Sequence, residues 1–218
     1  MEVLEHIGGL TLRQDRSLPM LGTDSLLLSR FATLRRGDRV LDLGCGVGVL
    51  GILLGSRERS LTLDGVELNP AAAELARRNL EENGLPGTIV TGDLRERSVF
   101  SQGHYDLIVS NPPYFTVDSG PAATRRRAEA RSETACTVGE LCAAAGPRLK
   151  TGGRFALVYR AERLTDLLCS LRAHALEPKR MQLVQTAAEK PPKLVLLEAV
   201  RQGKPGGLRI ECGGVSVG

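Results

Sequence analysis

The stretch VLDLGCGVG, at residues 40–48, decides the fold that this sequence predicts. An apolar strand, which begins at Arg39, runs directly into a glycine-rich turn. From residue 47 to residue 55 the apolar side chains recur at helical spacing. A strand that enters a helix through such a turn is typical of open α/β folds, in which the turn and the helix N-terminus bind a ligand.

Strands and helices alternate along the rest of the chain. Further strands are predicted from apolar runs at 61–66, 88–91, 105–110, 154–159, 180–185 and 194–200. Helices are predicted from amphipathic patterns at 23–34, 70–83, 137–150 and 162–173. Thr23 or Asp24 is the expected N-cap of the first helix, and Gly84 should follow the 70–83 helix in left-handed conformation. We expect a Rossmann-like α/β fold, with helices on both faces of a seven-stranded, mostly parallel sheet whose last strand is antiparallel.

Length and composition favour one globular domain. The chain has 218 residues, of which 42% are hydrophobic and 25% charged. No apolar run approaches the roughly 20 residues that span a bilayer, and the acidic N-terminus does not resemble a signal peptide, so we expect a cytoplasmic protein. Five cysteines without a C-x-x-C pair and three scattered histidines predict no metal site. No obligate protein partner is indicated.

Charge is distributed unevenly. Residues 1–110 carry 12 basic and 15 acidic side chains, whereas residues 111–218 carry 17 basic and 10 acidic ones. A basic second half suits a polyanionic substrate such as RNA. The alternative is a compositional bias, because Arg outnumbers Lys by 24 to 5.

Acidic residues at three successive strand ends indicate what the glycine-rich turn binds. Asp42 can accept a hydrogen bond from an ammonium group but would repel a pyrophosphate, and the spacing G-x-G-x-G differs from the dinucleotide fingerprint. Glu67 can bind both hydroxyls of a ribose, and Asp93 an adenine amino group, with Leu94 as an apolar wall. The alternative for each acid is a helix cap. Together they predict an S-adenosylmethionine site formed by Asp42, Gly44, Cys45, Gly46, Glu67, Leu68, Asp93, Leu94 and Asn111.

A second motif, NPPY at residues 111–114, follows the predicted 105–110 strand. The prolines hold the Pro112 carbonyl in a rigid turn beside the Asn111 amide, so two acceptors can bind both hydrogens of an exocyclic amine. Tyr114 offers a face on which a base can stack. Such acceptors favour the pyramidal, partly positive nitrogen of a methyl transfer. We therefore predict Asn111, Pro112, Pro113 and Tyr114 as the reacting site; the alternative is a plain tight turn.

The NPPY motif occurs in enzymes that methylate adenine N6, guanine N2 or the side-chain nitrogen of glutamine. Only 39 residues precede Val40, and the fold takes up most of the roughly 100 residues after Tyr114. We therefore expect neither the helical recognition domain of release-factor glutamine methyltransferases nor the target-recognition domain of adenine-specific DNA methyltransferases. A non-catalytic module that binds RNA or cofactor is a further alternative.

Four stretches carry a closer resemblance: LGTDSLLLSRFA (21–32), NPPYF (111–115), GGRFALVYRAERL (152–164) and LVLLEAVRQGKPGGLRI (194–210). They resemble the bacterial valine-tRNA adenine-N6 methyltransferases, and residues 40–200 resemble the class I methyltransferase fold. The resemblance implies methylation at N6 of the adenine just 3′ of the anticodon. It also implies that Thr23 and Asp24 lie over the methionine end of the cofactor. We accordingly expect a cofactor-covering segment at 1–39, a core at 40–200 and a tail at 201–218.

The loop at 119–137 differs from that family in one respect. Relatives often read Ala-Arg-His-Glu where residues 130–133 read ARSE, which leaves the role of the missing His, at Ser132, in question. The loop also holds four cations that we predict to bind RNA phosphates: Arg125, Arg126, Arg127 and Arg131. The alternative is a solvated charge run. Lys190, Lys193, Arg201 and Lys204 would extend this basic surface.

Overall fold

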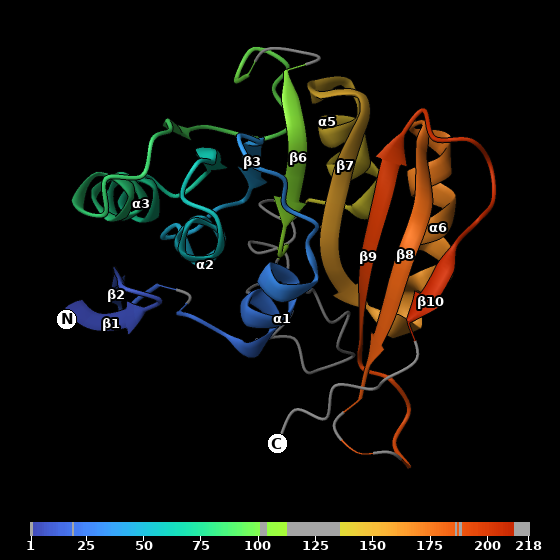
Figure 1. Cartoon of the computed structure of the whole chain (residues 1–218), viewed down its shortest axis with the longest axis horizontal. Coiled ribbons are helices and arrows are strands. Elements are labelled where there is room, and N and C mark those ends of the chain that lie inside the picture. Colours follow the sequence, from blue (N-terminus) through green and yellow to red (C-terminus); the bar gives the residue numbers. More distant parts are fainter. Residues whose placement is uncertain are drawn as a thin grey trace, which may run out of the picture.

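A computed structural model describes residues 2–18, 20–100, 104–112, 136–185, 187 and 189–211. Within these ranges the chain forms an eight-stranded sheet in the order β10-β8-β9-β7-β6-β3-β4-β5 (Figure 1). Its strands are β3 (Arg39–Leu43), β4 (Thr62–Glu67), β5 (Ile89–Thr91), β6 (Tyr105–Ser110), β7 (Leu149–Arg160), β8 (Leu176–Val184), β9 (Leu194–Arg201) and β10 (Arg209–Glu211).

Strand directions confirm the predicted mostly parallel sheet. β9 runs antiparallel to both of its neighbours, β7 and β8, and the other strand pairs are parallel. The short connection between β8 and β9 gives the antiparallel pair that its length predicted. The prediction of seven strands misses β10, whose three residues are all exposed and therefore leave no apolar pattern in the sequence.

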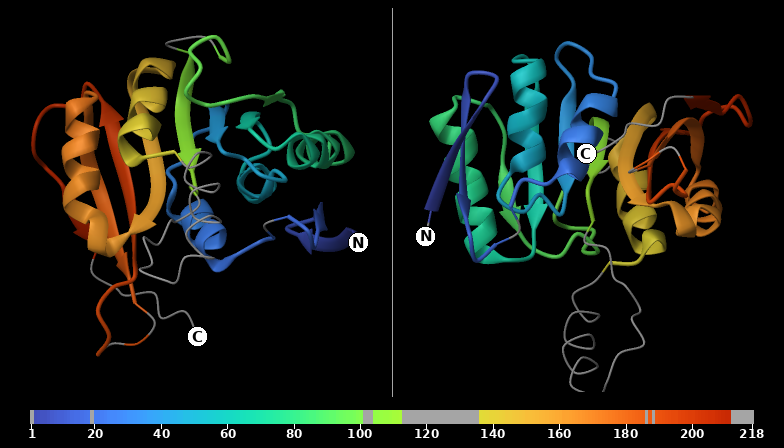
Figure 2. Two further views of the ribbon diagram at one scale, coloured as in Figure 1. Left: turned by 180° about the vertical axis from the view of Figure 1, so that it is seen from behind. Right: turned by 90° about the horizontal axis from the view of Figure 1, so that it is seen from below.

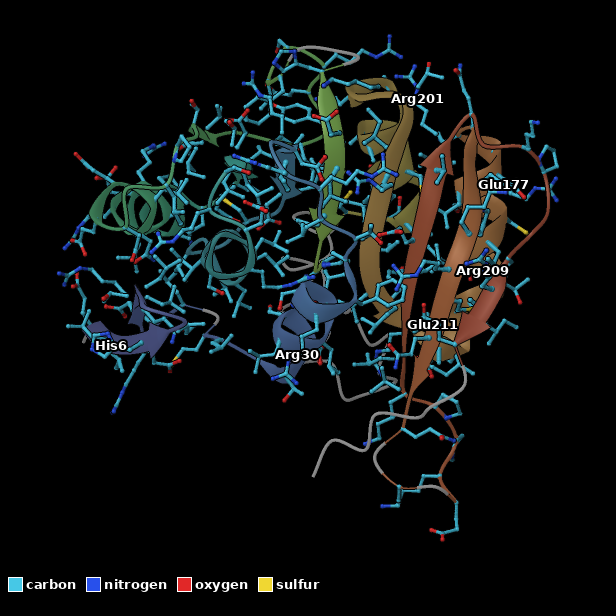
Figure 3. The ribbon with its side chains drawn as sticks, in the orientation of Figure 1. His6, Arg30, Glu177, Arg201, Arg209 and Glu211 are labelled. Carbon is cyan, nitrogen blue, oxygen red and sulfur yellow. The ribbon has the colours of Figure 1, made fainter. Side chains whose placement is uncertain are left out.

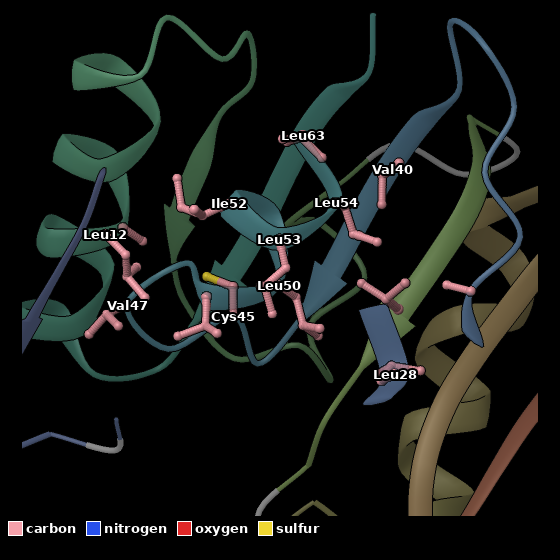
Figure 4. Close-up of a cluster of buried hydrophobic side chains, with 14 of the residues drawn as sticks. Leu12, Leu28, Val40, Cys45, Val47, Leu50, Ile52, Leu53, Leu54 and Leu63 are labelled. Atoms are coloured by element: carbon pink, nitrogen blue, oxygen red, sulfur yellow. The ribbon is translucent and has the colours of Figure 1, made fainter. Parts of the chain in front are cut away.

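Helices cover both faces of the sheet (Figure 2). Side chains of α1 (Thr23–Phe31), α2 (Val49–Arg57) and α3 (Pro70–Glu82) belong to one apolar cluster, part of which Figure 4 shows. Side chains of α5 (Val138–Arg148) and α6 (Leu164–Ala173), which follows the short helix η1 (Ala161–Arg163), belong to a second cluster. Val40 lies in the first cluster and Leu41 in the second, so β3 is buried on both faces. No helix in the described ranges is long and apolar enough to cross a bilayer.

Helix ends agree with the sequence in two places and correct it in one. α3 begins at Pro70 and Gly84 is left-handed with φ +60°, both as predicted. Asn69, which was not predicted as a cap, accepts from the main-chain N–H groups of Ala71 and Ala72. The N-cap of α1 is Gly22, and neither Thr23 nor Asp24. Helical geometry already begins at Thr23, so Asp24 lies within the first turn, where its charge favours the helix dipole.

A hairpin that the sequence analysis missed, β1 (Glu2–Ile7) and β2 (Leu10–Asp15), packs on α3. Asn79 of α3 and Asn83, its C-cap residue, form hydrogen bonds with the main chain of β2 of the kind that a neighbouring strand would form. The N–H groups of Arg13 and Thr11 donate to their Oδ1 atoms at 2.8 and 2.7 Å, and their Nδ2 atoms donate to the carbonyls of the same two residues. Asn79 Nδ2 also donates to the Val47 carbonyl, so the hairpin is tied to the glycine-rich turn.

Candidate functional site

A pocket of about 750 Å³ opens at the carboxyl ends of β3, β4, β5 and β6. Parallel strands bring their carboxyl ends to one edge of a sheet, which is where open α/β folds bind ligands. Eight of the eleven predicted cofactor residues line this pocket: Asp24, Gly44, Gly46, Glu67, Leu68, Asp93, Leu94 and Asn111. The structure therefore brings together residues that lie almost 90 positions apart in the chain.

The glycine-rich turn leaves its main chain accessible from the pocket. Gly44 and Gly46 have φ values of +77° and +53°, which residues other than glycine rarely adopt. No atom lies within 4 Å of the position that a Cβ atom would occupy at either residue. The N–H groups of Gly44 and Cys45 both donate to the Val66 carbonyl at 3.0 Å, which fixes the turn against β4.

Glu67 holds two parts of the pocket wall in place. Its Oε2 atom accepts from the Gly46 N–H at 2.9 Å, and its Oε1 atom accepts from the Asn69 N–H at 2.8 Å. An ionised carboxylate has about four lone-pair sites, so two sites remain for further donors. Glu67 thus fits the predicted role of binding two ribose hydroxyls, and it also orients the glycine-rich turn, a role that sequence reasoning missed.

Asp93 is paired with Arg95. Arg95 also lines the pocket, but the sequence did not indicate it. The main-chain N–H and Nε of Arg95 both donate to Asp93 Oδ1 at 2.9 Å. These side-chain hydrogen bonds hold the pKa of Asp93 below its usual value. Arg95 also lies 3.7 Å from Glu140 of α5. An adenine amino group bound by Asp93, as predicted from the sequence, would share this carboxylate with Arg95.

Three predicted cofactor residues do not line the pocket. Thr23 is exposed, and the thiol of Cys45 is buried in the first apolar cluster, where it packs against Gly65 of β4. Asp42 is 5% exposed, and its Oδ1 atom has no hydrogen-bond partner among the described residues. Burial, and then the charge of Glu67, raise the pKa of Asp42 to about 8. A direct contact between any of these three residues and the cofactor is not supported by the pocket.

We expect the buried carboxyl group of Asp42 to make stability depend on pH. Its pKa is about 8 in the folded protein, against about 4 in an unfolded chain. Its contribution to stability is therefore fully present below about pH 4 and is lost as the pH rises towards 8. An Asp42→Asn variant without cofactor should lose less thermal stability between pH 5 and pH 8 than the parent protein, because about one titrating group is removed.

Thermal unfolding at several pH values checks this expectation, with Asp166→Asn as the control, since Asp166 lies at the exposed start of α6. Parallel pH profiles for Asp42→Asn and the parent protein would contradict it.

Asn111 and Pro112 line the same pocket as the glycine-rich turn. Asn111 follows β6 directly, and its Nδ2 atom donates to Ser25 Oγ of α1 at 2.9 Å. The preceding residue, Ser110, donates to the Leu43 carbonyl at 2.7 Å, which fixes the end of β6 to the end of β3. Several other predicted residues lie outside the described ranges: Pro113, Tyr114, Arg125, Arg126, Arg127, Arg131 and Ser132.

Comparison with known proteins agrees with this geometry. The family described as "Methyltransferase small domain" matches residues 21–172, which run from the start of α1 through the pocket residues into α6. The chain belongs to this family. Its membership confirms the predicted enzyme class, a methyltransferase, and the predicted cofactor, S-adenosylmethionine. The size of the pocket, the open glycine-rich turn and the Glu67 carboxylate fit that cofactor.

Two curated relatives carry the name tRNA1(Val) (adenine(37)-N6)-methyltransferase. The methyltransferase is 36% identical over 207 residues to the one from Dickeya chrysanthemi, across 90% of its own chain and 81% of the relative. It is 34% identical over 187 residues to the one from Porphyromonas gingivalis, across 82% and 73% of the two chains. The predicted relationship to this group of proteins is confirmed.

Solved structures confirm the class I methyltransferase fold. A predicted O-methyltransferase from Agrobacterium tumefaciens superimposes with a TM-score of 0.69 at 18% identity, over 86% of this chain and 85% of the other. A methyltransferase from Pyrococcus furiosus gives 0.64 at 19% identity, over 88% and 89%. At these identities the likeness concerns the fold alone.

Proposed function

We propose that this methyltransferase transfers a methyl group to N6 of an adenine in tRNA, the adenine next to the anticodon of a valine tRNA. The observation that carries the proposal is the position of Asn111 and Pro112, which line one pocket with the glycine-rich turn and Glu67. The names of the relatives from Dickeya chrysanthemi and Porphyromonas gingivalis support the choice of acceptor. On this proposal the protein acts in the cytoplasm, where tRNA is found.

On this proposal, the chain's own residues prepare the acceptor nitrogen. When bound, S-adenosylmethionine supplies an electrophilic methyl group. The lone pair of an adenine amine is delocalised into the ring, so the amine is a poor nucleophile. The Asn111 side-chain carbonyl and the Pro112 main-chain carbonyl accept its two hydrogens and stabilise the positive charge that develops as the new bond forms. Pro113 stiffens the turn, and Tyr114 stacks on the base. The methylated nitrogen is acidic, so no strong base is needed.

For the cofactor, we propose that Glu67 binds the ribose, Asp93 and Leu94 bind the adenine and Asp24 lies near the methionine end. Leu68 is 44% exposed at the pocket, which suits an apolar contact with a ring. We retain residues 1–39 as the segment that covers the cofactor, because Leu18 and Asp24 line the pocket. The core then covers residues 40–200, and the tail at 201–218 adds β10 to the sheet.

Mass spectrometry of nucleosides from tRNA incubated with the protein and S-adenosylmethionine tests the proposal. N6-methyladenosine, in tRNA from a strain that lacks the enzyme, is the expected product. Detection of N2-methylguanosine in rRNA, or of methylglutamine in protein, would contradict the adenine acceptor and support one of the alternative acceptors of enzymes with the NPPY motif. Absence of methyl transfer to RNA and to protein would favour a non-catalytic binding module.

The four cations that were predicted to extend the basic surface lie at different ends of the sheet: Lys190 and Lys193 at one end, and Arg201 and Lys204 at the other. Lys190 and Lys193 lie in the loop that follows β8, which extends from the end of the sheet at which α1 lies (Figure 1). Both are exposed, and neither forms an ion pair within the described residues. Arg201 lies at the other end of the sheet from Arg30 of α1 (Figure 3), where it donates to the Leu149 carbonyl.

We expect a Lys190→Gln/Lys193→Gln variant to bind tRNA less tightly, because two phosphate contacts are lost. The slope of log affinity against log salt concentration should fall by about two. Filter binding or anisotropy at several salt concentrations measures this slope. Lys204 follows the end of β9 that carries Arg201, away from the loop after β8, so we do not expect it to extend the basic surface as the sequence predicted. A Lys204→Gln/Arg209→Gln variant removes the same charge from exposed positions and should keep the parent slope. Equal slopes for both variants would contradict a role for the loop.

A further inference from the structure

Ser25 joins the N-terminal segment to the predicted reacting site. Its hydroxyl accepts the hydrogen bond from Asn111 Nδ2 at 2.9 Å, across 86 positions of sequence. Ser25 is the third residue of α1 and is 7% exposed. The helix that carries it is anchored by the buried side chains of Leu27, Leu28 and Phe31. The hydroxyl is therefore held in a fixed position beside the end of β6.

The orientation of the Asn111 amide decides what it offers to a substrate. A carboxamide has one acceptor end and one donor end, which a half-turn about the last side-chain bond exchanges at almost no steric cost. An amine that gives both of its hydrogens needs the acceptor end. In the structure Ser25 accepts from the donor end. A serine hydroxyl can also donate, so the useful orientation is kept as long as Ser25 keeps this accepting role. The hydrogen bond from the Ser110 hydroxyl to the Leu43 carbonyl fixes the main chain before Asn111 but does not set that rotation.

We propose that Ser25 is a positioning residue for methyl transfer: by binding Nδ2 of Asn111, it holds the amide oxygen in the orientation that accepts a hydrogen from the acceptor amine. This inference rests on the proposed function, which assigns that acceptor role to Asn111. Ser25 acts through Asn111 and has no contact with the reacting atoms in this scheme. The neighbouring residue, Asp24, lines the pocket, so the first turn of α1 would serve the cofactor and the acceptor together.

A Ser25→Ala variant tests the inference. We expect kcat to fall about tenfold, the effect of one net hydrogen bond, while the KM for S-adenosylmethionine stays within about twofold. Unfolding is not expected, because alanine is the most favourable residue in a helix. Ser29 provides the matched control. It lies one turn further along α1 and is 2% exposed, and its hydroxyl donates to the Leu26 carbonyl at 2.8 Å. Ser29→Ala should retain the parent kcat.

Two outcomes would overturn the positioning role. One is a kcat for Ser25→Ala equal to that of Ser29→Ala; the other is a rise confined to the KM for S-adenosylmethionine, which would place Ser25 in cofactor binding. The measurements use whichever acceptor the parent protein methylates. An Asn111→Ala variant that keeps its activity defeats the acceptor role of Asn111, on which this inference rests, while absence of N6-methyladenosine from the parent protein's tRNA product defeats the proposed function. An inactive Asn111→Ala beside a normal Ser25→Ala defeats this inference alone.

Discussion

An Asn111→Ala variant is expected to lose methyl transfer almost completely while it still binds S-adenosylmethionine. The substitution removes one of the two acceptors that face the acceptor amine on our proposal, and it leaves Glu67 and the glycine-rich turn unchanged. Removing one preorganised group that stabilises transition-state charge typically lowers kcat by about 10²- to 10³-fold. Single-turnover methylation of tRNA measures the loss, and calorimetry with S-adenosylmethionine measures the binding that should persist.

An Asn111→Asp variant should show intermediate activity in the same experiment. Its carboxylate keeps an acceptor oxygen in the position of Oδ1, and the hydroxyl of Ser25 can donate to the other oxygen. Activity should therefore fall in the order parent, Asn111→Asp, Asn111→Ala, with similar melting temperatures for all three proteins. Parent-like activity of Asn111→Ala would place the methyl transfer elsewhere in the pocket. Loss of cofactor binding in both variants would mean that the predicted cofactor role of Asn111 outweighs its role at the acceptor.

The central strands could be predicted from the sequence because burial on both faces leaves a continuous apolar run. The predicted bounds of β3 and β6 are those of the structure. β7 begins at Leu149, five residues before the predicted start, because Lys150, Thr151 and Gly152 extend it as exposed residues without an apolar pattern. Periodicity thus predicts a strand only as far as the strand is buried.

The hairpin of β1 and β2 shows a second limit. Gly8 and Gly9 between alternating residues were a usable turn signal, since two glycines favour a tight hairpin turn. What holds the hairpin, however, is a pair of asparagines, one on α3 and one at its C-cap, more than 60 positions away. Such side-chain to main-chain pairs follow from tertiary structure and leave no local pattern. The capping of α1 by Gly22 likewise depends on where the linker from the hairpin enters the helix.

At the site, the chemical types of the residues were predictable but their partners were not. Glu67 and Asp93 line the pocket as predicted, whereas Asp42, on the strand before the turn, is buried outside the pocket lining. Arg95 and Ser25 were missed because their importance comes from contacts with Asp93 and Asn111. A sequence motif can identify a functional residue, but the residue that orients it is visible only in three dimensions.

A Glu67→Ala variant should bind S-adenosylmethionine about a hundredfold more weakly, since charge-assisted hydrogen bonds to a carboxylate are roughly twice as strong as neutral ones and two of them are lost. The loss has two sources. The ribose hydroxyls lose their acceptor on our proposal, and the Gly46 and Asn69 N–H groups lose the carboxylate that orients them. Calorimetry with S-adenosylmethionine measures the change.

A Glu67→Gln variant keeps part of both interactions, with the ribose and with the main-chain N–H groups. Glutamine keeps one acceptor oxygen, so it can still satisfy either Gly46 or Asn69, but its amide nitrogen turns a donor towards the other N–H. Its affinity should lie between that of the parent and that of Glu67→Ala. The control is Glu74→Ala, because Glu74 is a carboxylate on α3 whose side chain is 65% exposed and pairs with Arg77. Its affinity for the cofactor should equal that of the parent. If Glu67→Ala also binds like the parent, then the cofactor does not use the carboxyl end of β4, and the ribose must be bound elsewhere in the pocket.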